Sequence, residues 1–138
     1  MKWMLGFLLL VVSLFCGILF CFVKANPTHV ATSFSAQEIA KLQLTDIPKE
    51  LQNPESLSTG KVYFLTHCEY CHGLQGQGTR RAPDLTDKKW IHGDGSFNSM
   101  VSIIKEGVPN TMMLNWNSRL REDDIKLIAA YVRAMRHD

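Results

Sequence analysis

Two cysteines separated by two residues, with a histidine directly after them, constrain this chain more than any other feature. Cys68, Cys71 and His72 form the pattern C-x-x-C-H within the run HCEYCHG. Thiols at this spacing can bond covalently to the two vinyl groups of a haem, and the next histidine is then held beside the iron. The motif therefore predicts one covalently bound haem c and a fold that wraps around it.

Three other interpretations of the motif are weaker. A thioredoxin-like redox pair occurs in a strand–helix–strand setting, whereas the surrounding residues have a helical pattern. A structural zinc ion takes four protein ligands, and no second cluster of Cys and His follows in the sequence. A structural disulfide between Cys68 and Cys71 would leave the adjoining His72 unexplained. Haem attachment accounts for all three residues together.

The composition limits what else the chain can be. It has 138 residues, of which 46% are hydrophobic and 20% charged, with a net charge of +2. These values are typical of a globular protein, and the charge is too small for general binding to nucleic acid. No catalytic triad or pair of catalytic carboxylates stands out, so we expect no enzyme in its own right. A domain this small has a marginal core, which a large apolar cofactor would complete.

The beginning of the chain is apolar and carries no charge between Lys2 and Lys24. As a helix, this run would span about 30 Å, the thickness of the bilayer hydrocarbon. We therefore expect residues 1–25 to form an N-terminal transmembrane anchor. The run is longer than the apolar region of an ordinary signal peptide. Residues 23–25 would nevertheless suit a cleavage site, so a removed signal peptide is the alternative.

The rest of the sequence divides into a tether and a helical domain. Residues 26–56 contain three of the five prolines, so we expect a flexible tether there, with one short helix capped by Ser35 and Glu38. Residues 57–138 are expected to form the helical domain. Its three amphipathic patterns lie near residues 58–68, 96–106 and 122–136. The first of these has Ser56 or Ser58 as its expected cap.

A long loop and a shorter one separate the three helical patterns. The loop over residues 72–95 is rich in Gly and Pro, and such a length is uncommon in a small domain unless the loop encloses something. Side chains that could fill the sixth iron position are His67, His92, His137, Met100, Met112 and Met113. His67 lies too near the attachment cysteines to reach the opposite haem face, and Met100 falls on the apolar stripe of a helix. The shorter loop, residues 107–116, carries Met112 and Met113 and is the favoured source of the ligand.

These features together resemble the class I cytochromes c, over about residues 57–135. In that family the first and last helices cross through a glycine and an aromatic residue on one helix and an aliphatic and an aromatic residue on the other. Gly60 and Phe64 match the first pair, and Ile128 and Tyr131 match the second. The resemblance implies an all-α, cytochrome c-like domain wrapped around one covalent haem, preceded here by the transmembrane helix.

A closer similarity is to the cytochrome c subunits and domains of cbb-type haem–copper oxidases. Their A-P-[DN]-L-T-D…W loop is matched by residues 82–90, and their G-x-P-x-T-x-M-P-x-W loop by residues 107–116. The chain departs from the second pattern at Leu114, where the family usually has proline. It also has one haem motif, whereas those oxidase subunits usually have two.

The resemblance implies a complete set of site residues. The carbonyl of Pro83 would accept a hydrogen bond from His72 and so fix its tautomer. His72 and Met113 would be the axial ligands of the iron, with Met112 as the alternative to Met113. The cofactor-binding residues are then Cys68, Cys71, His72, Pro83 and Met113.

The resemblance also implies a function. We expect a membrane-anchored monohaem cytochrome that carries single electrons in a respiratory chain, located in the bacterial inner membrane with its haem domain facing the periplasm. Its partners would be a quinol-oxidising complex or a dehydrogenase as donor and a terminal oxidase as acceptor. The alternatives are a subunit built into an oxidase or dehydrogenase complex, and a gas-binding sensor in which the methionine is displaced. A subunit that keeps its haem chiefly for stability is a further alternative.

Four basic residues lie on the long loop, namely Arg80, Arg81, Lys88 and Lys89. They would form a docking surface for an acidic partner, compensate the charge of the haem propionates, or simply be a solvated face. Trp90 would either donate a hydrogen bond to a propionate or pack against the haem rim. Trp116 is interpreted as a core anchor for the shorter loop.

Overall fold

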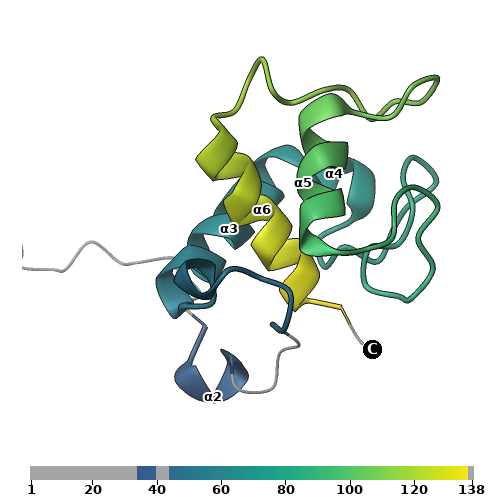
Figure 1. The fold of residues 1–138 in the computed structure, drawn as a ribbon. Coiled ribbons are helices and arrows are strands. Elements are labelled where there is room, and N and C mark those ends of the chain that lie inside the picture. The colour runs from purple at the N-terminus through teal and green to yellow at the C-terminus, as the bar shows by residue number, and fades with distance from the viewer. Residues whose placement is uncertain (1–33, 40–43, 137–138) are drawn as a thin grey trace, which may run out of the picture. The chain divides into compact units, whose positions relative to one another are not determined.

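The computed structural model describes residues 34–39 and 44–136, all within one compact unit. Every regular element in these residues is helical, as the sequence predicts (Figure 1). The elements are α2 (Ala36–Ile39), the 3₁₀ helix η1 (Lys49–Leu51), α3 (Pro54–His67), α4 (Glu69–His72), α5 (Phe97–Glu106) and α6 (Glu122–Ala134). The expected N-terminal anchor lies outside the described residues. Among the helices that are described, none has the length and hydrophobicity to cross a membrane.

Helix α3 begins one turn earlier than the sequence pattern indicated. Its N-cap is Asn53, whose side chain accepts a hydrogen bond from the backbone of Ser56 at 2.9 Å, and Pro54 is its first residue. Proline suits this position because its fixed φ matches the helix and its missing N–H would have no partner there. The prediction of Ser56 or Ser58 as the cap was therefore wrong, because Pro54 was attributed to the tether.

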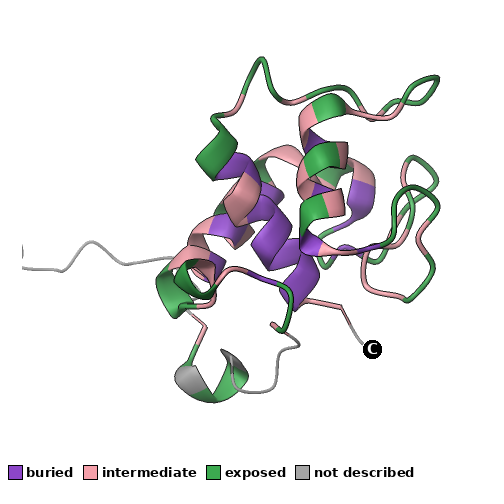
Figure 2. Ribbon diagram, in the orientation of Figure 1, coloured by how far each residue is buried: buried purple, intermediate pink, exposed green. Residues whose placement is uncertain are grey.

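The crossing of α3 and α6 forms the centre of the core (Figure 2). A Cβ atom at Gly60 would collide with the backbone carbonyl of Leu127, so only glycine allows this approach. Phe64 is fully buried, and its ring centroid lies 5.4 Å from that of Tyr131. The predicted contact between the first and last long helices is thus confirmed. Helix α5 packs against α6 as well.

The described part of the expected tether packs against the helices. Ile47 is only 3% exposed and belongs to the core. One carboxylate oxygen of Asp46 accepts a hydrogen bond from the backbone N–H of Phe97 at 2.8 Å, and the other lies 2.8 Å from Nε of Arg133 on α6. Farther back, the ring of Phe34 lies 6.1 Å from that of Tyr131. Residues 44–53 are therefore part of the folded domain.

The long loop between α4 and α5 folds back on itself. The backbone N–H of Leu85 donates to the carbonyl of Gly76 at 2.7 Å, and that of Gly78 donates to the carbonyl of His72 at 2.8 Å. Gly78 has a φ of +78°, and a Cβ atom there would lie 2.6 Å from the backbone nitrogen of Asp84. Glycine is needed at this point because the conformation and the close approach both exclude a side chain. The loop thereby becomes one wall of the cavity described next.

Candidate functional site

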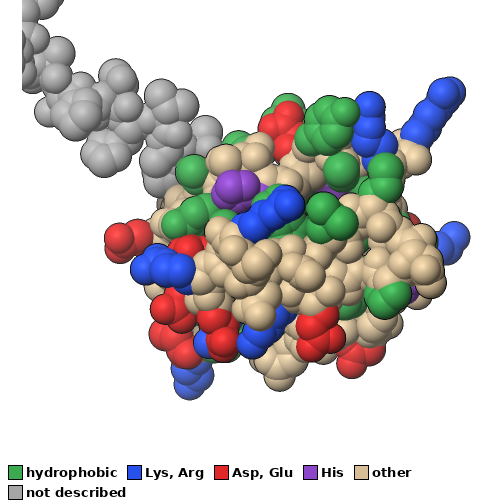
Figure 3. All heavy atoms as spheres, turned by 90° about the horizontal axis from the view of Figure 1, so that it is seen from above, with side chains coloured by type: hydrophobic (Ala, Val, Ile, Leu, Met, Phe, Trp, Pro, Cys, Tyr) green, Lys and Arg blue, Asp and Glu red, His purple; other side chains and the backbone are tan. Residues whose placement is uncertain are grey.

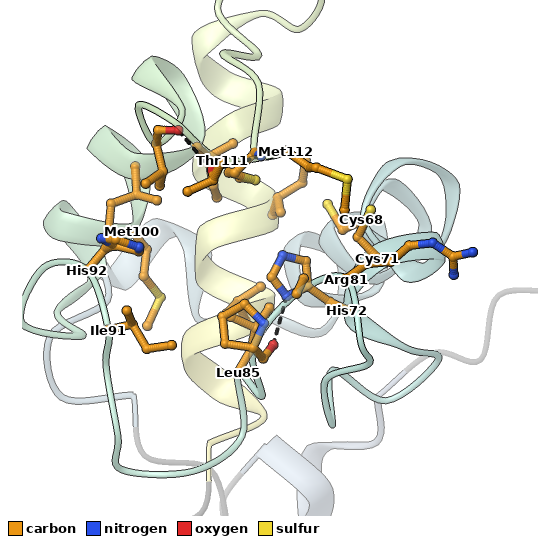
Figure 4. Close-up of a pocket in the computed structure, with 18 of the residues that line it drawn as sticks. Cys68, Cys71, His72, Arg81, Leu85, Ile91, His92, Met100, Thr111 and Met112 are labelled. Carbon is orange, nitrogen blue, oxygen red and sulfur yellow. Dashed lines mark hydrogen bonds between the residues drawn. The ribbon is translucent and has the colours of Figure 1, made fainter.

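A mostly apolar cavity of about 290 Å³ lies among the helices and the two loops. Its lining residues come from the end of α3, α4, the long loop, α5, residues 108–116 and α6. Figure 4 shows Cys68, Cys71 and Arg81 on one side of the cavity, Ile91, His92 and Met100 on another, Thr111 and Met112 above, and Leu85 below. The cavity therefore brings together the attachment motif and both loops, as the sequence predicts.

The two cysteines are positioned by the turn that joins α3 and α4. The backbone N–H of Cys71 donates to the carbonyl of Cys68 at 3.1 Å, and that of His72 donates to the same carbonyl at 2.9 Å. Both thiols are free and line the cavity. Burial, and secondarily the neighbouring Cys71, raises the pKa of the Cys68 thiol to about 12. A redox-active pair instead needs a thiolate with a lowered pKa, so the site does not fit a thioredoxin-like role.

His72 is buried and held by one hydrogen bond. Its Nδ1–H donates to the carbonyl of Pro83 at 3.0 Å, because a carbonyl can only accept. Burial lowers the pKa of His72 below its usual value, and the bond to Pro83 partly offsets this. The imidazole is therefore neutral near pH 7, with Nε2 free to bind a metal. Figure 4 shows the ring projecting into the cavity, with the edge that is not bonded to Pro83 turned toward Thr111 and Met112.

The shorter loop presents two methionines that differ in burial. Met112 is 64% exposed, whereas Met113 is half-buried and packs against the core. The backbone N–H of Val108 donates to the carbonyl of Met113 at 2.9 Å, and the N–H of Met113 donates to Oγ1 of Thr111 at 3.1 Å. These bonds fold the loop into a closed turn. Both methionines line the cavity, but the backbone holds Met113 in place from both of its sides.

Three of the other candidate ligands are less suitable, and His137 lies outside the described residues. Met100 is 3% exposed and belongs to the core, as its position on a helical stripe indicated. His92 is exposed on the cavity wall. His67 lines the cavity between two other rings, the ring of Tyr63 at 6.2 Å and the ring of Trp116 at 5.4 Å. From the sequence, this histidine was predicted only as a possible iron ligand. Its spacing from Tyr63, one helical turn, was the signal that could have shown the stacking.

The basic residues of the long loop are all exposed, and two of them border the cavity. Arg81 and Lys89 line it, and the Arg81 guanidinium lies 4.4 Å from the ring centroid of Tyr70. Trp90 lines it as well, and its indole Nε1 is buried without a hydrogen-bond partner. A buried N–H without a partner costs free energy, and this atom lies against Gly95, where a Cβ atom would collide with it.

The groups that line the cavity have the chemistry that a haem requires. The cavity is apolar and combines two free thiols with a neutral imidazole aimed inward. Among the residues that the structure describes, no group of three or more His, Cys, Asp or Glu side chains could hold a metal ion. The apolar lining, the paired thiols and the inward imidazole fit a haem, whose large ring is apolar and whose iron needs few protein ligands.

Comparison with known proteins gives the same family. The sequence profile described as "Cytochrome C oxidase, cbb3-type, subunit III" matches residues 55–132. Subunit CcoP of the cbb3-type oxidase of Cereibacter sphaeroides is 39% identical over 80 residues, which cover 55% of this chain and 26% of that protein. Subunit FixP of Azorhizobium caulinodans is 35% identical over 112 residues, covering 73% of this chain and 37% of that protein. The chain thus spans well under half the length of these relatives.

Solved structures share the fold. Cytochrome cL from Hyphomicrobium denitrificans has a TM-score of 0.56 and 27% identity, covering 60% of this chain and 49% of that one. Cytochrome cL from Methylophaga aminisulfidivorans has a TM-score of 0.55, and at 24% identity the likeness concerns the fold alone; it covers 72% of this chain and 68% of that one. Haem c is the cofactor of such cytochromes, and Cys68 and Cys71 have the spacing for its covalent attachment. Because the family profile spans more than half of its residues, this chain belongs to the cbb3-type cytochrome c oxidase subunit III family.

Proposed function

We propose that this protein transfers single electrons through one haem c whose iron is bound by His72 and Met113. The supporting observation is the cavity, in which the attachment motif, an inward-facing imidazole and a methionine loop line the same apolar space. Haem c, when bound, supplies an iron that gains and loses one electron. Two permanent ligands leave no open position for oxygen or peroxide, so the role is electron transfer rather than catalysis.

Each site residue then has a separate task. Cys68 and Cys71 hold the porphyrin edge through thioether bonds. The carbonyl of Pro83 accepts a hydrogen bond from Nδ1–H of His72, which leaves Nε2 available to the iron and increases the basicity of Nε2. A thioether from Met113 favours the ferrous state and so gives a relatively high reduction potential.

Met113 rather than Met112 is the proposed ligand because of its burial and its backbone. A ligand must be held in one position, and Met113 is packed against the core and bonded to Val108 and Thr111. Met112 is mostly exposed to solvent. Trp90 and the basic residues of the long loop would face the propionates.

Spectroscopy of the haem-loaded protein tests this assignment. We expect a low-spin c-type spectrum when the protein is reduced, and the weak near-infrared band of methionine-bound iron when it is oxidised. Carbon monoxide should bind the reduced protein slowly, because Met113 must first leave the iron. Rapid binding, or the lack of the near-infrared band, would instead favour a gas-binding haem and end the proposal.

We further propose that the electron partners meet the protein at the rim of the cavity. Ile91, Met112 and Leu114 line the cavity and are 56–69% exposed, next to the cations Arg81 and Lys89. Figure 3 shows hydrophobic and Lys or Arg side chains close together on one face, with most Asp and Glu side chains in this view toward one edge. Such a surface suits an acidic partner. A quinol-oxidising complex or a dehydrogenase would be the donor, and a terminal oxidase the acceptor.

The place of the protein in the cell is part of the same proposal. The uncharged run between Lys2 and Lys24 would anchor the chain in the bacterial inner membrane, with the haem domain in the periplasm. The printed names of the relatives favour a subunit bound within an oxidase complex as the second candidate, against a free carrier. Purification of detergent-solubilised membranes distinguishes them. Stoichiometric co-purification with oxidase subunits supports the bound subunit, and a single haem protein supports the carrier.

A further inference from the structure

A row of aromatic rings joins the attachment motif to the methionine loop. His67 is the last residue of α3 and directly precedes Cys68. Its imidazole lies 6.2 Å from the ring of Tyr63, with an angle of 17° between the planes, and 5.4 Å from the ring of Trp116, with an angle of 54°. Both distances are in the favourable range for ring pairs. His67 therefore connects the end of α3 with the residue that closes the loop.

Trp116 fixes the far end of that loop. Its backbone N–H donates to the carbonyl of Ile104 at 3.1 Å, which attaches it to the end of α5. Its ring is half-buried against the core, and the Arg119 guanidinium lies 5.7 Å from the ring centroid. The backbone of Trp116 is thus held by α5, while its side chain reaches α3 through His67.

Met113 lies between these supports. Its hydrogen bonds run to Val108 and Thr111, within the loop itself. Its two sequence neighbours, Met112 and Leu114, are 64% and 56% exposed and pack little. The loop therefore keeps its own shape through its hydrogen bonds, its end is attached to α5 through Trp116, and the ring contact of Trp116 with His67 links it to the end of α3. His67 makes that contact one residue away from Cys68.

We propose that His67 is a positioning residue for the sixth iron ligand. Its ring contact with Trp116 fixes the methionine loop relative to Cys68, and so holds the Met113 thioether within reach of the iron. This inference rests on the proposed ligation by His72 and Met113. Because an aromatic pair stabilises its arrangement by about twofold to tenfold in equilibrium terms, loss of the ring should weaken methionine binding by that factor.

Substitutions at His67 in the haem-loaded full chain test the proposal. In His67→Ala we expect carbon monoxide to bind the reduced protein about twofold to tenfold faster. When the oxidised protein is titrated to alkaline pH, the near-infrared band should disappear at a lower pH than in the wild type, because the methionine is held less firmly on the iron. His67→Phe keeps a ring at this position and should restore both properties. Thr66→Ala, at an exposed position beside it, is the matched control and should resemble the wild type.

A second variant keeps the test decisive if His67→Ala fails to load haem. Trp116→Leu removes the same ring contact from the loop side and should produce the same two changes, and combining it with His67→Ala should add little. Wild-type behaviour of both single variants would overturn the positioning role, as would His67→Phe behaving like His67→Ala. A wild-type protein without the near-infrared band would refute the His72 and Met113 ligation itself, so the two failures are distinguishable.

Discussion

Burial and a single hydrogen bond determine the chemistry of His72. Burial keeps the imidazole neutral, and the bond from Nδ1 to the Pro83 carbonyl selects the tautomer that leaves Nε2 unprotonated. Trp90 differs from His72 in that its buried indole N–H has no hydrogen-bond acceptor. A polar group of this kind is tolerated where a bound partner completes it.

Trp90→Phe tests this interpretation of the indole. The substitution removes the N–H and keeps most of the packing, so we expect the haem-loaded protein to lose about 1 kcal/mol of unfolding free energy. Urea unfolding followed by circular dichroism measures the difference. Ile91→Ala, at an exposed neighbouring position, should change the stability little. Unchanged stability of Trp90→Phe would show that the indole only packs in the cavity.

At the scale of elements, the ends of α2 and α5 follow local sequence rules, whereas the beginning of α3 was predicted wrongly. The boundaries of α5 follow local rules, since Ser96 caps its beginning and Gly107, with a φ of +74°, ends it. The short helix α2 has the predicted capping box, in which Ser35 and Glu38 bond to each other's backbone N–H at 2.7 and 3.2 Å. Helix α3 was misplaced at its start, because a proline in a polar segment suits a tether and a first helical turn equally well.

Gly60→Ala tests the crossing of α3 and α6. The added methyl group would meet the Leu127 carbonyl, so the helices must move apart. Overpacking of this kind costs about 1–3 kcal/mol of unfolding free energy. Thermal unfolding of the haem-loaded protein measures it, with Thr59→Ala on the same helix as control. Equal stability of the two variants would mean that the crossing adjusts without strain.

The methionine loop is tested by a pair of substitutions. Met113→Leu should abolish the near-infrared band, lower the reduction potential and allow rapid binding of carbon monoxide, because leucine has no sulfur to bind the iron. Met112→Leu should leave all three properties unchanged, since its side chain is mostly exposed. Absorption spectroscopy and a redox titration give the answer. The reverse result would assign the ligand to Met112.

At the scale of the whole molecule, the segment before α3 is joined to the helical domain. Asp46 connects residues 44–53 to the beginning of α5 and to Arg133 of α6. Phe34 contacts Tyr131 in the same core. The expected tether is therefore shorter than the composition indicated, because its described part is held by these contacts. A shorter tether would restrict how far the haem domain moves from the proposed anchor.

Electron exchange with a partner is also a property of the whole surface. In the double variant Arg80→Gln with Arg81→Gln, we expect reduction by membranes to slow at low ionic strength, because charge attraction accelerates encounter. The difference should fade near 0.15 M salt, where the screening length is about 8 Å. Lys49→Gln with Lys61→Gln removes equal charge away from the cavity lining and should have little effect. Rates that are equal and independent of salt would exclude the docking surface.

The sequence alone determined the features that depend on neighbouring residues. The attachment motif, the capping box of Ser35 and Glu38 and the apolar faces of the helices each involve residues within a few positions of one another, so they can be predicted from the chain alone. The resemblance added the contact of Gly60 with α6 and the bond from His72 to Pro83, which the structure contains.

Tertiary structure decided which side chains meet across the fold. Four features arise only when α3, α5 and α6 pack together. They are the different burial of Met113 and Met112, the unpaired indole N–H of Trp90, the bonds of Asp46 to Phe97 and Arg133, and the contact of His67 with Trp116. The last two join residues far apart in sequence. Their contact follows from packing geometry, which no local pattern encodes.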